Sequence, residues 1–335
     1  MGDEGFADRV TRVTNGFMEA KIVMAGAELK LYDRLSTGAA TAEELTADLE
    51  VTRRGIEILG DALTALGYLV KTGDRYANAD GTERYLVRGK PESLAFITTH
   101  RNHMYRGWGQ LEEVIRHGKQ GREGEKPTLA DVEINRNFIL AMAEVSRGRL
   151  GVILDRLPLA DASLFVDLGG GPAHYCCEAV QRHPALRALL VDLPLTTEVA
   201  REYISERGLA DRVATRVVDF YGEDRFGWGE PADGVLISQV LHAEGADENR
   251  ALLRKVWPNV RPGGWVAIVE NPVDEGRTSP VPGAMFAVNM LAATARGRTF
   301  TEAEMAGWLT DAGFDPRPGE LVAPRTLLIL AHKPA

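Results

Sequence analysis

The first quarter of the chain has apolar residues at helical spacing. The pattern predicts two helices within residues 6–35, with a break near Gly26. Two shorter helices are predicted to follow, one begun by a capping box at Thr41 and one capped by Thr52. Residues 68–77 then alternate around a Gly-Asp turn, which predicts a β-hairpin. Helices followed by such a hairpin are typical of a winged helix.

The next segment, residues 91–157, has a helical pattern apart from a loop near 118–127. The stretch from His100 to Trp108 is rich in large polar and aromatic side chains. His100 and His103 share one helix face, a spacing found in metal sites, but no Cys or Glu at matching spacing completes a ligand set. The alternatives are a helix packed at a domain junction and a helix that lines a substrate pocket.

After position 161, strands alternate with helices, which predicts a parallel sheet. The predicted strands are 164–167, 186–192, 213–219, 234–240, 264–270, a short strand containing Phe314, and 326–332. The predicted helices are 172–183, 195–207, 247–258 and one that begins at a capping box at Thr301 and ends at Gly313. A five-stranded parallel core with a terminal hairpin gives seven strands. The predicted domains are residues 1–90, a helical bridge over 91–160, and an α/β domain over 161–335.

Composition and charge narrow the class of partner. The 335 residues are 44% hydrophobic, and the net charge of -9 argues against nucleic acid or an anionic membrane as the partner. The helix before the hairpin offers only Arg53 and Arg54, so dimerisation rather than DNA binding is the expected role of the winged helix. No apolar run reaches the roughly 18 residues of a membrane span, and no signal-peptide pattern begins the chain. The two cysteines, Cys176 and Cys177, are adjacent and do not read as a disulfide framework, so a reducing compartment and a cytoplasmic location are expected. Both cysteines are expected to pack as small buried residues.

Residues 164–174 read Leu-Phe-Val-Asp-Leu-Gly-Gly-Gly-Pro-Ala-His and predict a buried strand, a glycine turn and a helix. Glycines let backbone N–H groups approach a nucleotide, and the start of a helix offers unpaired donors. The dinucleotide pattern G-x-G-x-x-G requires its third glycine at the position of His174, and no Walker lysine follows. The stretch therefore predicts a nucleoside cradle of another kind.

In an open parallel sheet, ligands lie at the carboxyl ends of the strands. Those ends carry Asp167 with the glycine turn, Asp192, Asp219 with Phe220, His242 and Glu270. A carboxylate after the second strand can accept both ribose hydroxyls. A carboxylate followed by an aromatic residue can receive an exocyclic amine while the ring packs on a base. Many carboxylates and no phosphate-binding cation favour a positively charged nucleoside, and S-adenosylmethionine is such a ligand.

Several motifs at these positions are shared with a known family. They are Val-Asp-Leu-Gly-Gly-Gly (166–171), Val-Asp-Leu-Pro (191–194), Val-Asp-Phe-Tyr (218–221), Val-Leu-His (240–242), Arg-Pro-Gly-Gly (261–264) and Asn-Met-Leu (289–291). With them the chain resembles, over nearly its whole length, the S-adenosylmethionine-dependent O-methyltransferases of the caffeate and acetylserotonin type and their bacterial natural-product relatives. The resemblance implies an α/β fold, with a seven-stranded Rossmann-like class I methyltransferase domain and an N-terminal all-helical winged-helix dimerisation domain. It also implies a homodimer, S-adenosylmethionine as cofactor with S-adenosylhomocysteine as product, and a small aromatic acceptor from secondary metabolism.

The resemblance also implies roles for individual residues. Asp192 is expected to hold the ribose, Asp219 and Phe220 the adenine, and the turn at 169–171 the methionine part. The full set expected to bind the cofactor is Asp167, Gly169, Gly170, Gly171, Asp192, Leu193, Asp219, Phe220, Ser238 and Gln239. The set expected to line the substrate pocket, with core packing as the alternative for each, is Met104, Trp108, Met285, Phe286, Asn289 and Met290. No metal is expected.

His242 stands where the family has its general base. An unperturbed imidazole has a pKa of about 6.5, so it is largely neutral at pH 7 and can take the proton of a phenol as the methyl group transfers. Glu270 matches the carboxylate that orients this histidine in the family and would stabilise the imidazolium. His242 and Glu270 are therefore the expected catalytic residues.

Three positions depart from the family pattern. His242 is followed by Ala-Glu-Gly instead of Asp-Trp, the glycine motif ends in Pro172-Ala173, and Gly297 stands where a second glutamate is normal. Asp247 and Glu244 are the candidates to replace that carboxylate. These departures leave three enzymatic alternatives: C-methylation, N-methylation, and a reaction that uses the cofactor without methyl transfer. A winged-helix regulator that senses a ligand is the non-enzymatic alternative.

Overall fold

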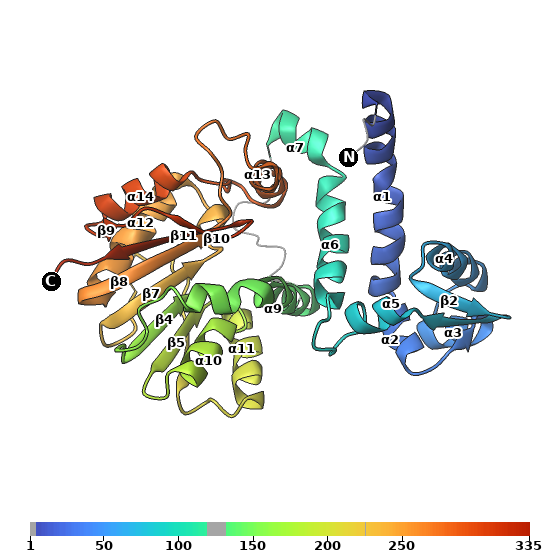
Figure 1. Cartoon of the computed structure of the whole chain (residues 1–335), viewed down its shortest axis with the longest axis horizontal. Coiled ribbons are helices and arrows are strands. Elements are labelled where there is room, and N and C mark those ends of the chain that lie inside the picture. The colour runs from blue at the N-terminus through green and yellow to red at the C-terminus, as the bar shows by residue number, and fades with distance from the viewer. Residues whose placement is uncertain (1–4, 119–131, 225) are drawn as a thin grey trace. The chain divides into compact units, whose positions relative to one another are not determined.

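A computed structural model describes residues 5–118, 132–224 and 226–335. The chain forms two compact units, one ending at Arg106 and the other beginning at Gly107 (Figure 1). The segment 91–160, predicted as a bridge, is divided between them. Most of the predicted loop at 118–127 lies outside the described residues. Within the described ranges, no helix is long and apolar enough to cross a membrane.

The N-terminal unit is a small helical domain with one short sheet. Its elements are α1 (Phe6–Glu28), α2 (Leu31–Ser36), β1 (Ala40–Thr41), α3 (Ala42–Leu49), α4 (Arg53–Ala65), β2 (Leu69–Thr72), β3 (Arg75–Asn78), α5 (Asp80–Tyr85) and most of α6 (Ala95–Trp108). The capping box at Thr41 and the cap at Thr52 are both present. The predicted hairpin is confirmed, and β1 adds a third strand in the order β1-β3-β2, so the unit is not entirely helical.

The predicted helix break near Gly26 is wrong by a few residues. Gly26 lies inside α1, and the chain turns at Lys30, whose φ is +57°. Gly26 serves packing instead, because a Cβ at this position would lie 2.5 Å from the hydroxyl of Tyr32. A glycine in a helical pattern therefore marked a close contact and not a turn.

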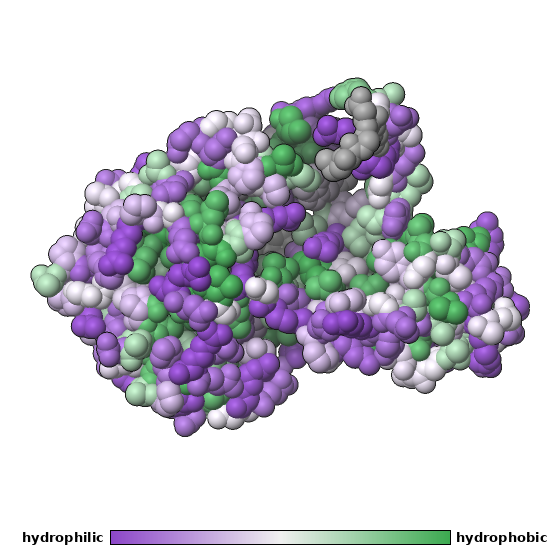
Figure 2. Space-filling model, in the orientation of Figure 1, coloured by the Kyte–Doolittle hydropathy of each residue, from purple (hydrophilic) through white to green (hydrophobic). Residues whose placement is uncertain are grey.

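The C-terminal unit is an α/β domain. Its helices are α7 (Leu111–His117), α9 (Val132–Leu154), α10 (His174–Arg182), α11 (Pro194–Glu206), η1 (Leu241–Ala243), α12 (Ala246–Val256), η2 (Trp257–Asn259), α13 (Val281–Ala293) and α14 (Glu302–Asp311). Its strands are β4 (Leu164–Leu168), β5 (Arg187–Asp192), β6 (Val213–Val217), β7 (Ala232–Ser238), β8 (Val260–Glu270), β9 (Asp315–Pro316), β10 (Glu320–Ala323) and β11 (Thr326–His332). Figure 2 shows hydrophilic side chains over much of the visible face of this unit, with hydrophobic ones between them.

The sheet order is β10-β11-β8-β7-β4-β5-β6, with β9 also paired to β11. Five neighbouring strands of the sheet, β8, β7, β4, β5 and β6, are parallel to one another, whereas β11 is antiparallel to β8. The strand predicted around Phe314 is in fact two short pieces, β9 and β10, because Pro318 and Gly319 separate them. Both pieces pair with β11, so the sheet keeps seven strand positions.

Side chains of both sheet faces are buried, as the continuous apolar runs of the strands require. One face packs against α12 and α14 through residues such as Val166 and Trp308. The other face packs against α9, α10 and α11 through residues such as Phe165 and Val180. The strand order reverses between β4 and β7, so the loops after these two strands meet at the switch point of the sheet, where α/β folds bind ligands.

Candidate functional site

The loop after β4 forms the predicted glycine turn. Gly169 has φ +75°, and a Cβ there would lie 2.7 Å from Cγ2 of Val240. A Cβ on Gly170 would lie 2.1 Å from Oδ2 of Asp167. Ala173, where the family pattern has glycine, adopts φ +65° and packs in the core. The first two glycines are therefore required by close contacts with the side chains around them.

Asp167 lies beneath this turn and is fully buried. Among the described residues, neither of its carboxylate oxygens has a hydrogen-bond partner. Burial, together with the nearby carboxylate of Asp192, raises the pKa of Asp167 to about 8. A buried carboxyl group in this state is suited to a ligand that brings a donor or a positive charge.

Asp192 ends β5 and is oriented by backbone donors. Its Oδ2 accepts the N–H of Gly171 at 3.0 Å, and its Oδ1 accepts the N–H of Leu193 at 2.7 Å. Burial raises the pKa of Asp192 to about 6, so the carboxylate is largely ionised at neutral pH. Each oxygen keeps further acceptor capacity for a ligand hydroxyl.

Asp219 and Phe220 follow β6. Asp219 is exposed, and its Oδ1 accepts the N–H of Gly222 at 2.9 Å, which closes a turn. The Phe220 side chain is buried beside the glycine turn, with its Cζ 3.4 Å from the position of a Cβ on Gly169. The structure thus brings Phe220 and the glycine turn together, as the sequence predicted from separate motifs.

Ser238 ends β7 at the switch point, and Gln239 follows the strand. Gln239 has φ +58°, an unfavourable conformation for a residue with a side chain. Its Nε2 donates to the carbonyl of Val269 at 3.3 Å, and its Oε1 accepts from Nδ2 of Asn271 at 2.8 Å. Contacts within the protein therefore fix the Gln239 side chain, and Ser238 lies near the hydroxyl of Tyr175.

His242 and Glu270 form a close pair. Nδ1 of His242 lies 2.8 Å from Oε2 of Glu270, and the backbone N–H of His242 donates to Oε1 at 3.3 Å. The Glu270 side chain is only 5% exposed and that of His242 only 14%. Because Glu270 engages Nδ1, Nε2 is the ring nitrogen left to meet a substrate.

Helix α13 supplies most of the predicted substrate residues. The ring of Phe286 meets the His242 ring edge-on, with centroids 4.8 Å apart. Oδ1 of Asn289 accepts from Nε1 of Trp108 at 3.0 Å. Met290 is buried and Met285 is exposed, while Met104 lies on α6 in the N-terminal unit.

Arg149 on α9 is a residue that the sequence analysis missed. Within the part of the chain that the structure describes, its buried Nε has no hydrogen-bond partner. Its charge acts on His174 and Tyr175, the first two residues of α10, and Oγ of Ser146 lies 2.6 Å from Nε2 of His174. Burial, and then the charge of Arg149, lower the pKa of His174 to about 3, so this imidazole is neutral. Arg149 lies outside every motif, and only packing shows its position.

Two features singled out in the sequence lie elsewhere. His103 pairs with Glu28 at 3.3 Å, and burial lowers the pKa of His100 to about 4. Among the described residues, no three His, Cys, Asp or Glu side chains are placed to hold a metal ion. Cys176 and Cys177 are buried, and burial raises the pKa of Cys177 to about 11, which makes it unreactive at neutral pH.

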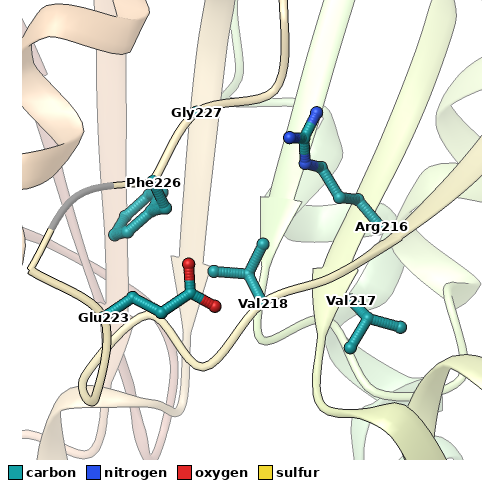
Figure 3. A pocket seen from close by; sticks show the side chains of 6 residues that line it. All are labelled: Arg216, Val217, Val218, Glu223, Phe226 and Gly227. Atoms are coloured by element: carbon teal, nitrogen blue, oxygen red, sulfur yellow. The ribbon is translucent and has the colours of Figure 1, made fainter.

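A separate hollow lies at the edge strand β6 (Figure 3). Its volume is about 300 Å³, and the described residues that line it are Arg216, Val217, Val218, Glu223, Phe226 and Gly227. They come from β6 and from the loop that leads to β7. This set includes none of the predicted site residues, so the hollow is distinct from the cradle at the switch point.

Known proteins show the same arrangement of domains. The sequence profile of the O-methyltransferase domain matches residues 108–315, and that of the O-methyltransferase dimerisation domain matches residues 11–88. The chain is 30% identical to the tetracenomycin polyketide synthesis 8-O-methyl transferase of Streptomyces glaucescens, over 96% of this chain and 95% of that protein. It is also 30% identical to the 3-hydroxy-5-methyl-1-naphthoate 3-O-methyltransferase of Streptomyces sahachiroi, over 91% of this chain and 88% of that protein.

A solved structure agrees with these matches. An O-methyltransferase family protein from Burkholderia thailandensis superimposes with a TM-score of 0.84 at 26% identity, and the match covers 99% of both chains. The profile, the sequence relatives and the fold agree over nearly the full length of the chain. The chain therefore belongs to the S-adenosylmethionine-dependent O-methyltransferase family.

Proposed function

We propose that this protein transfers a methyl group from S-adenosylmethionine to a hydroxyl group of a small aromatic acceptor, with His242 as the general base. The observation that carries the proposal is the 2.8 Å contact between Nδ1 of His242 and Glu270 at the carboxyl end of the sheet. This contact directs Nε2 toward a substrate. The cradle formed by Asp167, the glycine turn and Asp192 lies at the same end of the sheet.

The residues of the cradle fit S-adenosylmethionine. The buried, unpartnered oxygens of Asp167, counted among the described residues, suit the ammonium of the methionine part. The guanidinium of Arg149 suits its carboxylate, since Arg binds carboxylates with paired donors. Asp192 suits the ribose hydroxyls, and Phe220 a stacked base. Bound S-adenosylmethionine supplies a methyl group made electrophilic by its sulfonium centre.

His242 would receive the proton of the acceptor hydroxyl at Nε2. The carboxylate of Glu270 would stabilise the resulting imidazolium through Nδ1–H. Orientation supplies much of the remaining catalysis, because the acceptor oxygen must lie in line with the methyl group.

The aromatic character of the acceptor is supported by two observations. Phe286 presents its ring at the edge of His242, where it can pack against a flat substrate. The two Streptomyces relatives are named for the O-methylation of a polyketide and of a hydroxynaphthoate. We therefore infer a phenolic hydroxyl as the site of methylation.

The test is an assay with S-adenosylmethionine labelled in its methyl group. 3-Hydroxy-5-methyl-1-naphthoate and N-acetylserotonin serve as probes, and the products are analysed by mass spectrometry and NMR. Label on a phenolic oxygen, with release of S-adenosylhomocysteine, is the expected result. Label on carbon or nitrogen, or cofactor turnover without a methylated product, would favour the alternative reactions instead.

Cofactor binding is expected to release a proton near neutral pH. Because the pKa of Asp167 is about 8 in the protein alone, this carboxyl group is largely protonated at pH 7. A bound ammonium favours its ionised form, so affinity for S-adenosylhomocysteine should rise between about pH 6 and pH 8. Titration calorimetry at pH 7 in buffers of different ionisation enthalpy measures the released proton. Asp167→Asn should abolish the release, whereas Asp219→Asn should retain it, and equal release from both variants would contradict the assignment.

The N-terminal unit is proposed to form a homodimer. Helix α1 exposes Phe6, Val10, Val13 and Phe17 at a spacing of four, three and four residues, which makes one apolar stripe. The dimerisation-domain profile covers most of this helix. Sedimentation of the full chain should give about twice 36.6 kDa. The double variant Val13→Glu/Phe17→Glu should sediment as a monomer, and Leu321→Glu, an equally exposed position in the other unit, should not.

A further inference from the structure

Two consecutive hydrogen bonds, which meet at the buried Asn249, join the segment after β6 to the turn that carries His242. The hydroxyl of Tyr221 donates to Oδ1 of Asn249 at 2.7 Å. Nδ2 of Asn249 donates in turn to the carbonyl oxygen of Leu241 at 2.8 Å. Asn249 lies on α12 and is fully buried. These hydrogen bonds thus connect two segments that are separated along the sequence by 19 residues, 222–240.

We propose that Tyr221 and Asn249 are positioning residues for the general base: together they hold the turn η1 in the conformation that sets His242 against Glu270. The proposal rests on the function proposed above for His242. Asn249 acts through the backbone carbonyl of Leu241, the residue before His242, and Tyr221 acts through the side chain of Asn249.

The turn η1 needs such support because its own hydrogen bonds are few. It is a single 3₁₀ turn, in which the N–H of Ala243 donates to Val240 at 3.1 Å and that of Glu244 donates to Leu241 at 3.4 Å. Hydrogen-bond geometry in 3₁₀ turns is poorer than in α-helices. Gln239, two residues before the turn begins at Leu241, has an unfavourable positive φ. The bond from Asn249 is therefore the shortest that holds the Leu241 carbonyl, and it fixes the residue next to the base.

The direction of each hydrogen bond follows from Tyr221. Burial, and then the charges of Glu244, Glu270 and Glu248, raise the pKa of Tyr221, so its hydroxyl stays protonated and donates. A donor at this place requires Oδ1 of Asn249 to face it, which leaves the two N–H groups of the amide for Leu241. An aspartate at 249 would accept from Tyr221 but would oppose the Leu241 carbonyl with a negative charge.

Tyr221, the first residue of this series of hydrogen bonds, also lies beside the cradle. Tyr221 follows Phe220, and their ring centroids are 5.2 Å apart. Phe220 packs beside the glycine turn at Gly169. Tyr221 and Asn249 therefore link the segment proposed to hold the adenine with the turn that holds the base.

The test compares Tyr221→Phe and Asn249→Asp with two matched variants elsewhere in the unit. Tyr203→Phe removes the hydroxyl of a tyrosine on α11 whose ring packs on Arg207. Asn259→Ala removes an amide that donates to the carbonyls of Phe226 and Lys255. Each protein is labelled with ¹³C at Cε1 of its seven histidines, and its spectrum is recorded with and without S-adenosylhomocysteine. The signal of His242 is assigned by its loss in His242→Ala.

The expected result is a single His242 signal in the unsubstituted protein and in both matched variants. In Tyr221→Phe and Asn249→Asp this signal should shift or split while the other signals stay in place. The dissociation constant of S-adenosylhomocysteine should change by less than about twofold. With an acceptor probe, kcat should fall about tenfold, because a small misplacement of a reacting group lowers the rate strongly. An unchanged His242 signal in both variants would overturn the proposal without any need for an acceptor.

A double-mutant cycle, with kcat measured for each variant, tests the positioning role separately from the role of His242 as general base. If Tyr221 acts through the base, Tyr221→Phe should have little further effect in a His242→Ala background. Full turnover by His242→Ala would instead reject the general base itself. Loss of activity in His242→Ala, with equal and independent losses from Tyr221→Phe in both backgrounds, would reject only the positioning role.

Discussion

His242→Ala is expected to lower kcat by about 10²–10⁴-fold, the range that a positioned acid–base group contributes. The substitution removes Nε2, the nitrogen proposed to take the acceptor proton, and leaves the carboxyl group of Glu270 without its partner. The cradle at Asp167 and Asp192 is untouched, so the dissociation constant of S-adenosylhomocysteine should stay within about twofold of its original value. Initial rates with an acceptor probe and calorimetric titrations measure the two quantities.

Glu270→Gln provides the matched comparison. The amide oxygen of glutamine can still accept from Nδ1 of His242, but the negative charge that stabilises the imidazolium is lost. A smaller loss of kcat, about 10- to 100-fold, is therefore expected. Equal rates for the original protein and His242→Ala would remove the histidine from the mechanism. A loss confined to cofactor affinity would make it a binding residue instead.

The apolar pattern of the sequence located most of the sheet because the parallel strands are buried on both faces. The bounds of β11 were predicted without error, and those of β4 and β5 to within one residue. The strand near Phe314 was less regular, since Pro318 and Gly319 separate β9 from β10. β1 escaped prediction because two residues are too few to show alternation.

The candidate site was predictable to the extent that its residues end strands. Asp167, Asp192 and Glu270 could be placed at one edge of the sheet from the chain alone, because the carboxyl ends of parallel strands share an edge. The contact between His242 and Glu270 could be expected only from the resemblance to a family. Arg149 and Asn249 lie on helices with no local signal, and they reach the site through packing between distant segments. Contacts of this kind between distant segments depend on the tertiary fold and leave no pattern in the local sequence.

The position of Gly297 explains one departure from the family pattern. A Cβ at this residue would lie 2.3 Å from the carbonyl oxygen of His242 and 2.8 Å from that of Ala243. The N–H of Gly297 donates to Oγ1 of Thr294 at 2.8 Å. Glu248 and Arg296, 2.8 Å apart, hold this loop against the start of α12. The loop after α13 therefore rests backbone to backbone on the turn that carries the base, and glycine is what allows this contact.

Gly297→Glu, although it would place a carboxylate where the family has one, is therefore expected to lower activity. The Cβ would push the backbone of His242 away, and because that backbone also donates to Glu270 the catalytic pair would be displaced with it. Overpacking of this kind typically costs about 1–3 kcal/mol of unfolding free energy, and a displaced base should reduce kcat by about 10- to 100-fold. Gly297→Ala tests the steric effect of the Cβ alone, and its activity should also fall.

Gly307→Ala on α14 is the matched control, since among the described residues nothing lies within 4 Å of its Cβ position. That variant should keep full activity and gain about 0.4–1 kcal/mol of stability. Denaturant unfolding and initial rates measure these effects. A Gly297→Glu variant with undiminished kcat would mean that the turn can yield without cost, and that the second carboxylate of the family is compatible with this fold after all.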